Sequence, residues 1–135
     1  MEQQVTGTFD VRLVPEKTDN PQAEAAGLLR MALDKQFHGS LEATGQGTML
    51  SVLDREKGSG GYVALERVTG TLDGRKGSFV LQHNATMDRG TPAMTVAVVP
   101  DSGTEELKGI AGTMTIRIEG GQHYYDLAYT LDSSK

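Results

Sequence analysis

Two polar side chains interrupt otherwise apolar segments of this sequence, and both are of types that transfer protons. Glu66 lies in the run YVALERV, and His83 lies in the run FVLQHN. If Glu66 points into a protein interior, loss of hydration raises its pKa and suits the carboxyl group to general acid or base catalysis. An inward imidazole beside it would complete an acid–base pair near neutral pH. The sequence therefore predicts Glu66 and His83 as candidate catalytic residues. The alternatives are a solvated charge or a satisfied buried carboxylate at Glu66, and a hydrogen-bonded structural histidine at His83.

The spacing of these two residues favours their meeting. A two-residue turn at Asp73-Gly74 would make a hairpin in which Glu66 and His83 are diagonal neighbours on one face. A three-residue loop would instead set Glu66 opposite Gln82, because a one-residue slip moves every side chain to the other face. Gln82 is therefore the alternative polar contact for a ligand.

Tyrosines offer a second kind of ligand contact. Tyr62 and Tyr125 are two of only four tyrosines and are candidates for ligand binding, since an amphipathic ring at a cavity mouth can hold a small molecule. For Tyr125 the competing interpretation is core packing or an oligomer face.

Metal and cofactor chemistry have little support in the sequence. His38, His83 and His123 are far apart and form no closely spaced ligand pair. The chain has no cysteine, so it has neither disulfides nor thiolate ligands. We expect no metal and no cofactor.

Composition excludes other partners. The chain has 135 residues and a net charge of -5, and no basic stripe of the kind that contacts phosphates. Hydrophobic residues make up 37% of the chain, with no stretch near the length of a membrane-spanning helix. We expect no nucleic-acid partner and no membrane partner. The absence of a signal-peptide pattern predicts a cytoplasmic location.

The elements that must position these residues are short strands separated by glycines. There are 17 glycines against 4 prolines, which is typical of an antiparallel β protein. A helical turn is expected in the loop around Glu105 to Leu107, and Pro21 to Met31 also invites a turn or two of helix. About eight strands are predicted: Val5 to Val14, Leu29 to His38, Ser40 to Leu53, Tyr62 to Thr69, Ser78 to Met87, Ala93 to Pro100, Gly112 to Glu119 and His123 to Leu131. A two-residue turn at Gly120-Gly121 would join the last two strands and pair Ile118 with His123.

Consecutive strands with short turns must hide their edges, and a closed barrel does so most completely. We therefore predict an all-β fold, a single eight-stranded antiparallel β-barrel over residues 1–135, with a linker-like loop at 15–27 and a frayed tail at 132–135. A two-sheet sandwich is the alternative. Apolar residues occur on both faces of the fourth to sixth strands, which predicts a homo-oligomer, a dimer or a tetramer, that covers the outer face.

Two segments carry a resemblance to a known family. Residues 61–83, GYVALERVTGTLDGRKGSFVLQH, and residues 98–112, VVPDSGTEELKGIAG, resemble a family of small bacterial proteins of unknown function. Structures of that family resemble the allene oxide cyclase and dirigent barrels. The resemblance runs from about Thr6 to Leu131 and is poor between Pro15 and Gly27. It implies an eight-stranded barrel with an internal cavity, commonly oligomeric, and no established activity.

Plant members of the wider superfamily cyclise or couple reactive intermediates in a shaped apolar cavity, and none of their catalytic residues is carried over to this sequence. Three functions therefore stand. The first is a barrel that binds a small apolar or mixed-polarity molecule. The second is a cyclase, isomerase or lyase that uses Glu66 and His83 for proton transfer. The third is an oligomeric structural protein with a filled barrel.

Overall fold

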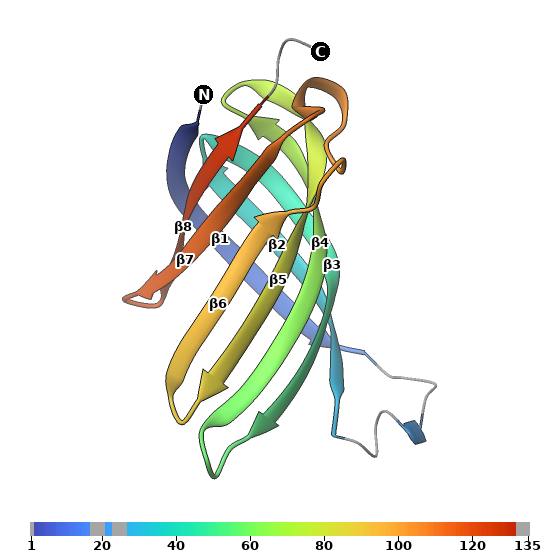
Figure 1. The fold of residues 1–135 in the computed structure, drawn as a ribbon, viewed down its shortest axis with the longest axis vertical. Coiled ribbons are helices and arrows are strands. Elements are labelled where there is room, and N and C mark those ends of the chain that lie inside the picture. The colour runs from blue at the N-terminus through green and yellow to red at the C-terminus, as the bar shows by residue number, and fades with distance from the viewer. Residues whose placement is uncertain (1, 17–20, 23–26, 132–135) are drawn as a thin grey trace.

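The computed structural model describes residues 2–16, 21–22 and 27–131, which form one closed antiparallel barrel (Figure 1). Each strand pairs with its neighbour in the chain, and the last strand closes on the first. The predicted barrel is therefore confirmed, and the alternative of a two-sheet sandwich is wrong. The strands are β1 (Gln3–Pro15), β2 (Leu29–Gly39), β3 (Leu41–Asp54), β4 (Ser59–Leu72), β5 (Arg75–Asp88), β6 (Thr91–Val98), β7 (Ala111–Glu119) and β8 (Gln122–Thr130).

The fourth and fifth strands are longer than predicted, because glycines that were taken as loop residues are part of the ladder. Ser59, Gly60 and Gly61 pair with the end of β3. Gly60 fits there because a Cβ atom would lie 2.4 Å from the backbone oxygen of Val52. A glycine in a strand often marks such a close approach of two backbones.

The predicted helical turn is confirmed as the 3-10 helix η1 (Glu105–Leu107). The helix expected between Pro21 and Met31 is wrong at its C-terminal end, because Leu29 begins β2. Residues 23–26 of that range lie outside the described residues. Most of the predicted loop at 15–27 and all of the predicted tail at 132–135 also lie outside them. Within the described residues, no helix has the length and apolar character needed to cross a membrane.

Both predicted hairpin registers are confirmed. In the β4–β5 hairpin, Glu66 pairs with Leu81 and Ala64 pairs with His83. In the β7–β8 hairpin, Ile118 pairs with His123 across Gly120-Gly121, and both of these glycines have positive φ. Turns of this length need such backbone angles, which glycine adopts without strain.

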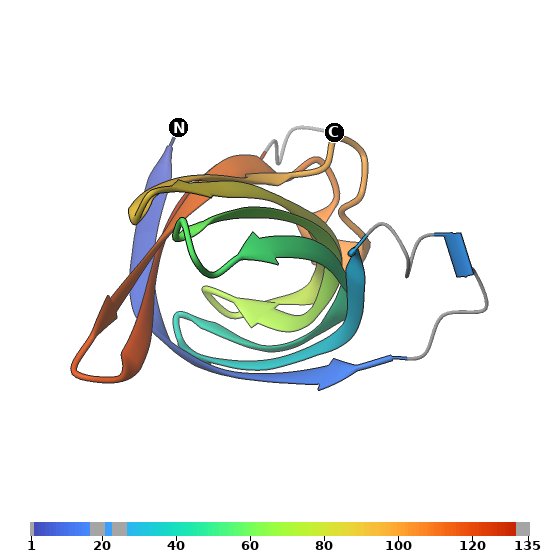
Figure 2. The same ribbon diagram turned by 90° about the horizontal axis from the view of Figure 1, so that it is seen from below.

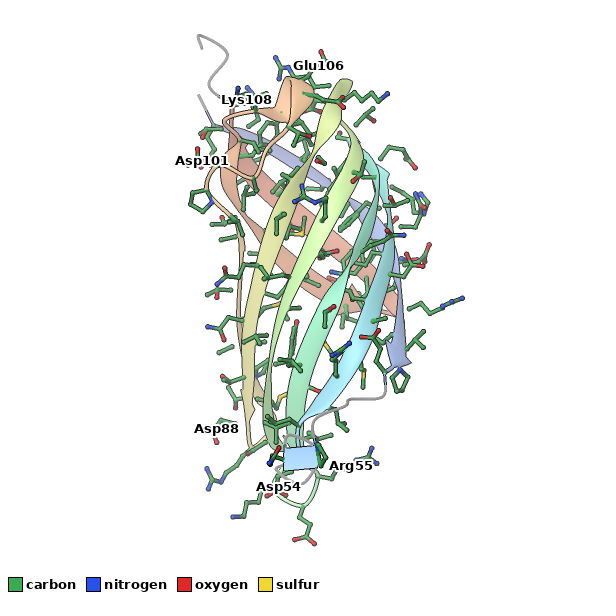
Figure 3. All side chains as sticks on the ribbon, turned by 90° about the vertical axis from the view of Figure 1, so that its right-hand side faces the viewer. Asp54, Arg55, Asp88, Asp101, Glu106 and Lys108 are labelled. Carbon is green, nitrogen blue, oxygen red and sulfur yellow. The ribbon has the colours of Figure 1, made fainter. Side chains whose placement is uncertain are left out.

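One end of the barrel is filled by side chains. Phe37, Phe79, Leu81 and Tyr125 have no measurable exposure, and Leu107 of η1 packs against the same cluster. The segment around η1 is held to β5 by a hydrogen bond from the Thr104 N–H to the Ser78 carbonyl. Figure 3 shows charged residues such as Glu106 and Lys108 on the outside of this end. This packed end supplies the core of the molecule.

The other end is open. β6 and β7 pair at only two positions, Val96 with Met114 and Ala97 with Thr113, and the two strands then diverge (Figure 1). Figure 2 looks into the ring of strands from this side. Large apolar side chains on the inward rows of their strands are exposed here, between 41% and 65%: Leu13, Leu29, Leu53, Met87, Met94 and Ile118. The rim of the open end is therefore apolar.

Candidate functional site

Three charged or ionisable side chains meet in the middle of the barrel, between its packed and open ends. The Glu66 Oε1 atom lies 2.8 Å from the Lys35 Nζ atom and 2.6 Å from the His83 Nε2 atom. Glu66 is 1% exposed, His83 2% and Lys35 6%. Charged side chains are almost never this deeply buried unless they are paired. We call these three residues the central cluster.

The central cluster spans four strands, and two glycines make it possible. Lys35 is on β2 and Glu66 is on β4, with β3 between them. The β3 residues that pair with these two are Gly45 and Gly47, neither of which has a side chain. A Cβ atom on Gly45 would lie 2.3 Å from the Glu66 Oε2 atom. The gap in the inner row of β3 therefore lets the lysine of β2 reach the carboxylate of β4.

The electrostatics of the central cluster favour an ionised carboxylate. Burial alone raises the pKa of Glu66, but the hydrogen bond from His83 and the positive charge of Lys35 outweigh it, so that the pKa lies below its ordinary value. The Lys35 ammonium also lies over the Phe9 ring, 4.9 Å from its centroid. The other carboxylate oxygen of Glu66, Oε2, is buried and has no hydrogen-bond partner among the described residues.

A chamber of about 230 Å³ adjoins the central cluster on its open side. Lys35 and His83 both line this inner chamber, whereas Glu66 lies behind them and does not. Lys35 and His83 are therefore the residues of the cluster that a molecule in the chamber would meet, and the Glu66 carboxylate holds both in place. The remaining lining comes from Tyr62, His123 and the apolar residues Phe9, Val11, Leu13, Leu33, Met49, Ala64, Met94, Ile116 and Ile118.

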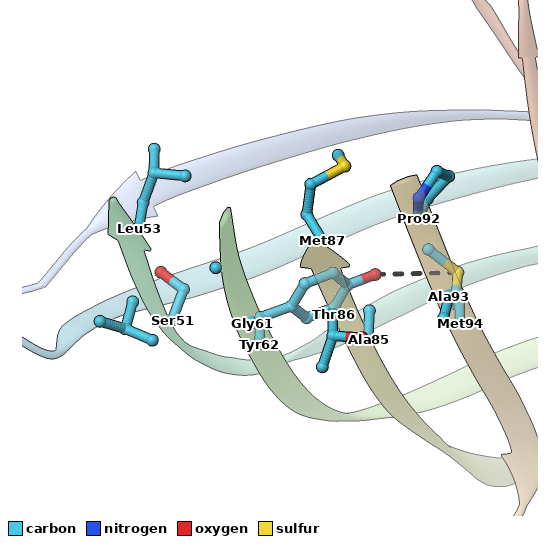
Figure 4. Close-up of a pocket in the computed structure, with 12 residues that line it drawn as sticks. Ser51, Leu53, Gly61, Tyr62, Ala85, Thr86, Met87, Pro92, Ala93 and Met94 are labelled. Carbon is cyan, nitrogen blue, oxygen red and sulfur yellow. Dashed lines mark hydrogen bonds between the residues drawn. The ribbon is translucent and has the colours of Figure 1, made fainter. Parts of the chain in front are cut away.

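A second chamber of about 270 Å³ lies beyond the first, between the ends of β3, β4, β5 and β6 (Figure 4). Tyr62 and Met94 line both chambers, and the Tyr62 hydroxyl contacts the Met94 Sδ atom at 3.9 Å. Burial and then the charge of Glu66 raise the pKa of Tyr62, so its hydroxyl stays protonated. These two side chains form the boundary between the inner and the outer chamber.

The structure brings together some of the residues that the sequence singled out and separates others. Glu66 and His83 are in contact, and Tyr62 lines the inner chamber. Gln82 was expected as a cavity contact if the register slipped, but the register did not slip, and Gln82 is exposed on the outer face. Tyr125 is buried at the packed end, where its hydroxyl accepts a hydrogen bond from the Leu41 N–H, and it does not line either chamber.

Sequence reasoning missed two residues, Lys35 and His123. Lys35 falls on the inward row of β2, between Leu33 and Phe37, and strict alternation would have indicated its position. His123 lines the inner chamber with its ring 5.1 Å from that of Phe9. No signal in its own segment distinguishes it from a surface histidine. In the part of the chain that the structure describes, no three His, Cys, Asp or Glu side chains are grouped as metal ligands.

The fold and the site together define the class of protein: an eight-stranded antiparallel barrel with one packed end, one open end and a buried Lys–Glu–His cluster facing an apolar chamber. The chain belongs to the DUF3224 family, described as proteins of unknown function, whose family model matches residues 5–129. The family membership expected from the two segments is thus confirmed.

A solved structure supports the same family and fold. The chain is 49% identical to a protein of unknown function of the DUF3224 family from Shewanella oneidensis MR-1, over 99% of this chain and 100% of that one. The TM-score of the two structures is 0.91. No curated protein matches the chain.

Proposed function

We propose that this barrel binds a small, mostly apolar molecule in its chambers. The observation that carries the proposal is the inner chamber itself, about 230 Å³ of space with an apolar lining and two polar groups of the central cluster at its base. Ligand pockets have this character, a mostly apolar wall with a few polar groups that fix orientation. The resemblance to allene oxide cyclase and dirigent barrels, which hold their substrates in such a cavity, belongs to the same proposal.

The energetics of the central cluster support a role other than stability. A buried ion pair often contributes nothing relative to apolar residues of the same volume, because both charges lose their hydration. Buried ionisable groups with strong partners are found preferentially at functional sites. Apolar side chains at positions 35 and 66 would therefore serve a purely structural barrel as well as this ion pair does.

Native mass spectrometry of freshly purified protein, together with titration by the apolar dye anilinonaphthalene sulfonate, tests this proposal. We expect a retained small molecule or saturable dye binding. The variant Ala64→Phe places a ring in the inner chamber and should abolish binding, while Val63→Phe adds the same ring to the outer face and should not. A bare protein mass combined with no dye binding would overturn the proposal.

An enzyme is the second candidate, favoured by one observation, the 2.6 Å contact between His83 and Glu66 beside the inner chamber. A carboxylate that orients an imidazole is a common arrangement for general acid–base catalysis. The reaction would be of the cyclase, isomerase or lyase type, with His83 moving the proton and Glu66 fixing the ring. Once a substrate is found, unchanged turnover by Glu66→Gln would remove Glu66 from the mechanism.

A further inference from the structure

The polar groups that line the inner chamber are all of one kind. They are Lys35, Tyr62, His83 and His123, and each of them can donate a hydrogen bond. No acidic side chain is among the described residues that line this chamber. The chain as a whole carries a net charge of -5, so a chamber lined by donors and potential cations contrasts with the molecule around it.

Glu66 lies behind the chamber, and one of its two carboxylate oxygens already has two partners. Glu66 Oε1 is hydrogen-bonded to Lys35 and His83. Glu66 Oε2 faces β3 at Gly45, in the space that a Cβ atom on this glycine would fill. Glu66 therefore holds the donors of Lys35 and His83 in place and does not meet the ligand. An ammonium has three donors, of which one is used by Glu66.

The remainder of the path from this base to the rim is mostly apolar, with Ser51 and Thr86 among the outer lining. From the inner chamber it passes Tyr62 and Met94 into the outer chamber, whose wall includes Leu53 and Met87. A ligand that fits both the donor-lined base and the path to the rim has a hydrogen-bond-accepting group at one end and an apolar body behind it.

We infer that the chamber takes a monocarboxylate with an apolar body, with the carboxylate against Lys35 and His83 and the apolar part directed to the open end. This inference rests on the proposed function and specifies its ligand class. A carboxylate is the acceptor that gains most here, because hydrogen bonds between an ammonium and a carboxylate are about twice as strong as neutral ones.

Calorimetric titration with three compounds of one chain length tests the inference: octanoate, octanol and octylamine. We expect octanoate to bind about tenfold more tightly than octanol, the difference between a charge-assisted and a neutral hydrogen bond. Octylamine should bind most weakly, because its ammonium would face Lys35. Equal affinity for octanoate and octanol, or a preference for octylamine, would overturn the ligand class and leave the proposed function standing. Failure of all three to bind, together with no dye binding, would overturn both.

Variants test the role assigned to the lysine. Lys35→Met should weaken octanoate binding about tenfold more than octanol binding, so that the preference for octanoate is lost. Because that variant leaves Glu66 with fewer partners and risks misfolding, the double variant Lys35→Met/Glu66→Gln removes both charges and keeps an amide beside His83. Lys57→Met is the matched control, since Lys57 is exposed and outside both chambers. A folded double variant that retains the tenfold preference would contradict the inference.

Discussion

At the scale of single residues, the central cluster depends on what is missing from β3. Lys35 and Glu66 belong to strands that are not hydrogen-bonded to each other, yet their side-chain atoms are 2.8 Å apart. They meet because Gly45 and Gly47 leave the inner row of the intervening strand without side chains. Glycine weakens a strand interior, so its presence at both positions indicates that the space it leaves is required.

Gly45→Ala should therefore destabilise the protein. The added methyl group would lie 2.3 Å from the Glu66 Oε2 atom and 3.2 Å from a ring carbon of Phe37, and both neighbours are buried. Overpacking of this kind costs about 1–3 kcal/mol in the free energy of unfolding, measurable by urea denaturation. Dye binding should also weaken, because Glu66 cannot move without disturbing Lys35 and His83.

Gly61→Ala is the control for the stability measurement. It is also a glycine in a strand, but the nearest atom to its Cβ position is 3.3 Å away, so a shift of a few tenths of an ångström accommodates it. If Gly45→Ala proves as stable as Gly61→Ala, the lack of a side chain at Gly45 is not what makes room for the Glu66 carboxylate.

At the scale of the elements, the seam between β6 and β7 differs from every other junction in the described barrel. β4 and β5 pair along their whole length, whereas β6 and β7 pair at two positions near the packed end. Met94 on β6 and Ile116 and Ile118 on β7 line the inner chamber on either side of this seam. The divergence of these two strands is thus what opens the chamber to the outside.

We expect the seam to open more readily than the rest of the barrel. Backbone groups with few cross-strand partners exchange their amide hydrogens through small local openings. Segments 91–95 and 115–119 should exchange faster than segments 64–68 and 79–83, and a bound ligand should slow them. Hydrogen exchange followed by mass spectrometry measures both effects, and uniform protection across the four segments would contradict the expectation.

At the scale of the whole molecule, the packed core that stabilises the fold and the proposed binding chambers lie at opposite ends of the barrel. The packed end buries the aromatic and aliphatic core beneath η1, and the open end leaves large apolar side chains at its rim. A chamber at one end of a barrel can stay unfilled because the opposite end supplies the buried apolar area that folding needs.

The outer face of β3 and β4 favours the expected homo-oligomer. Leu50 pairs with Val63 there, and Leu65 follows on the same row of β4; their exposed fractions are 45%, 52% and 54%. Exposed apolar clusters of this kind often mark an interaction surface. We expect a dimer or a tetramer by size-exclusion chromatography with light scattering, and Leu65→Glu should shift it toward the monomer. A monomeric native protein would contradict this expectation.

Much of the site was predictable from local pattern. The Asp73-Gly74 turn specified the register of β4 and β5, and with it the contact between Glu66 and His83, because a two-residue turn and the alternation of side chains leave one pairing. Lys35 was equally accessible to alternation but was overlooked. Gln82 was a valid alternative only while the length of the turn stayed open.

The sequence by itself determined the strands, their order, two hairpin registers and the row on which each side chain lies, since these depend on turn residues and on a period of two. Only the tertiary structure decided which row of each strand faces inward. It also decided that Lys35 reaches Glu66 across the glycines of β3, and that Tyr125 belongs to the packed end while Tyr62 borders the chambers. These facts depend on the curvature and closure of the barrel, which bring together residues of different strands by distance in space, and no local pattern encodes that distance.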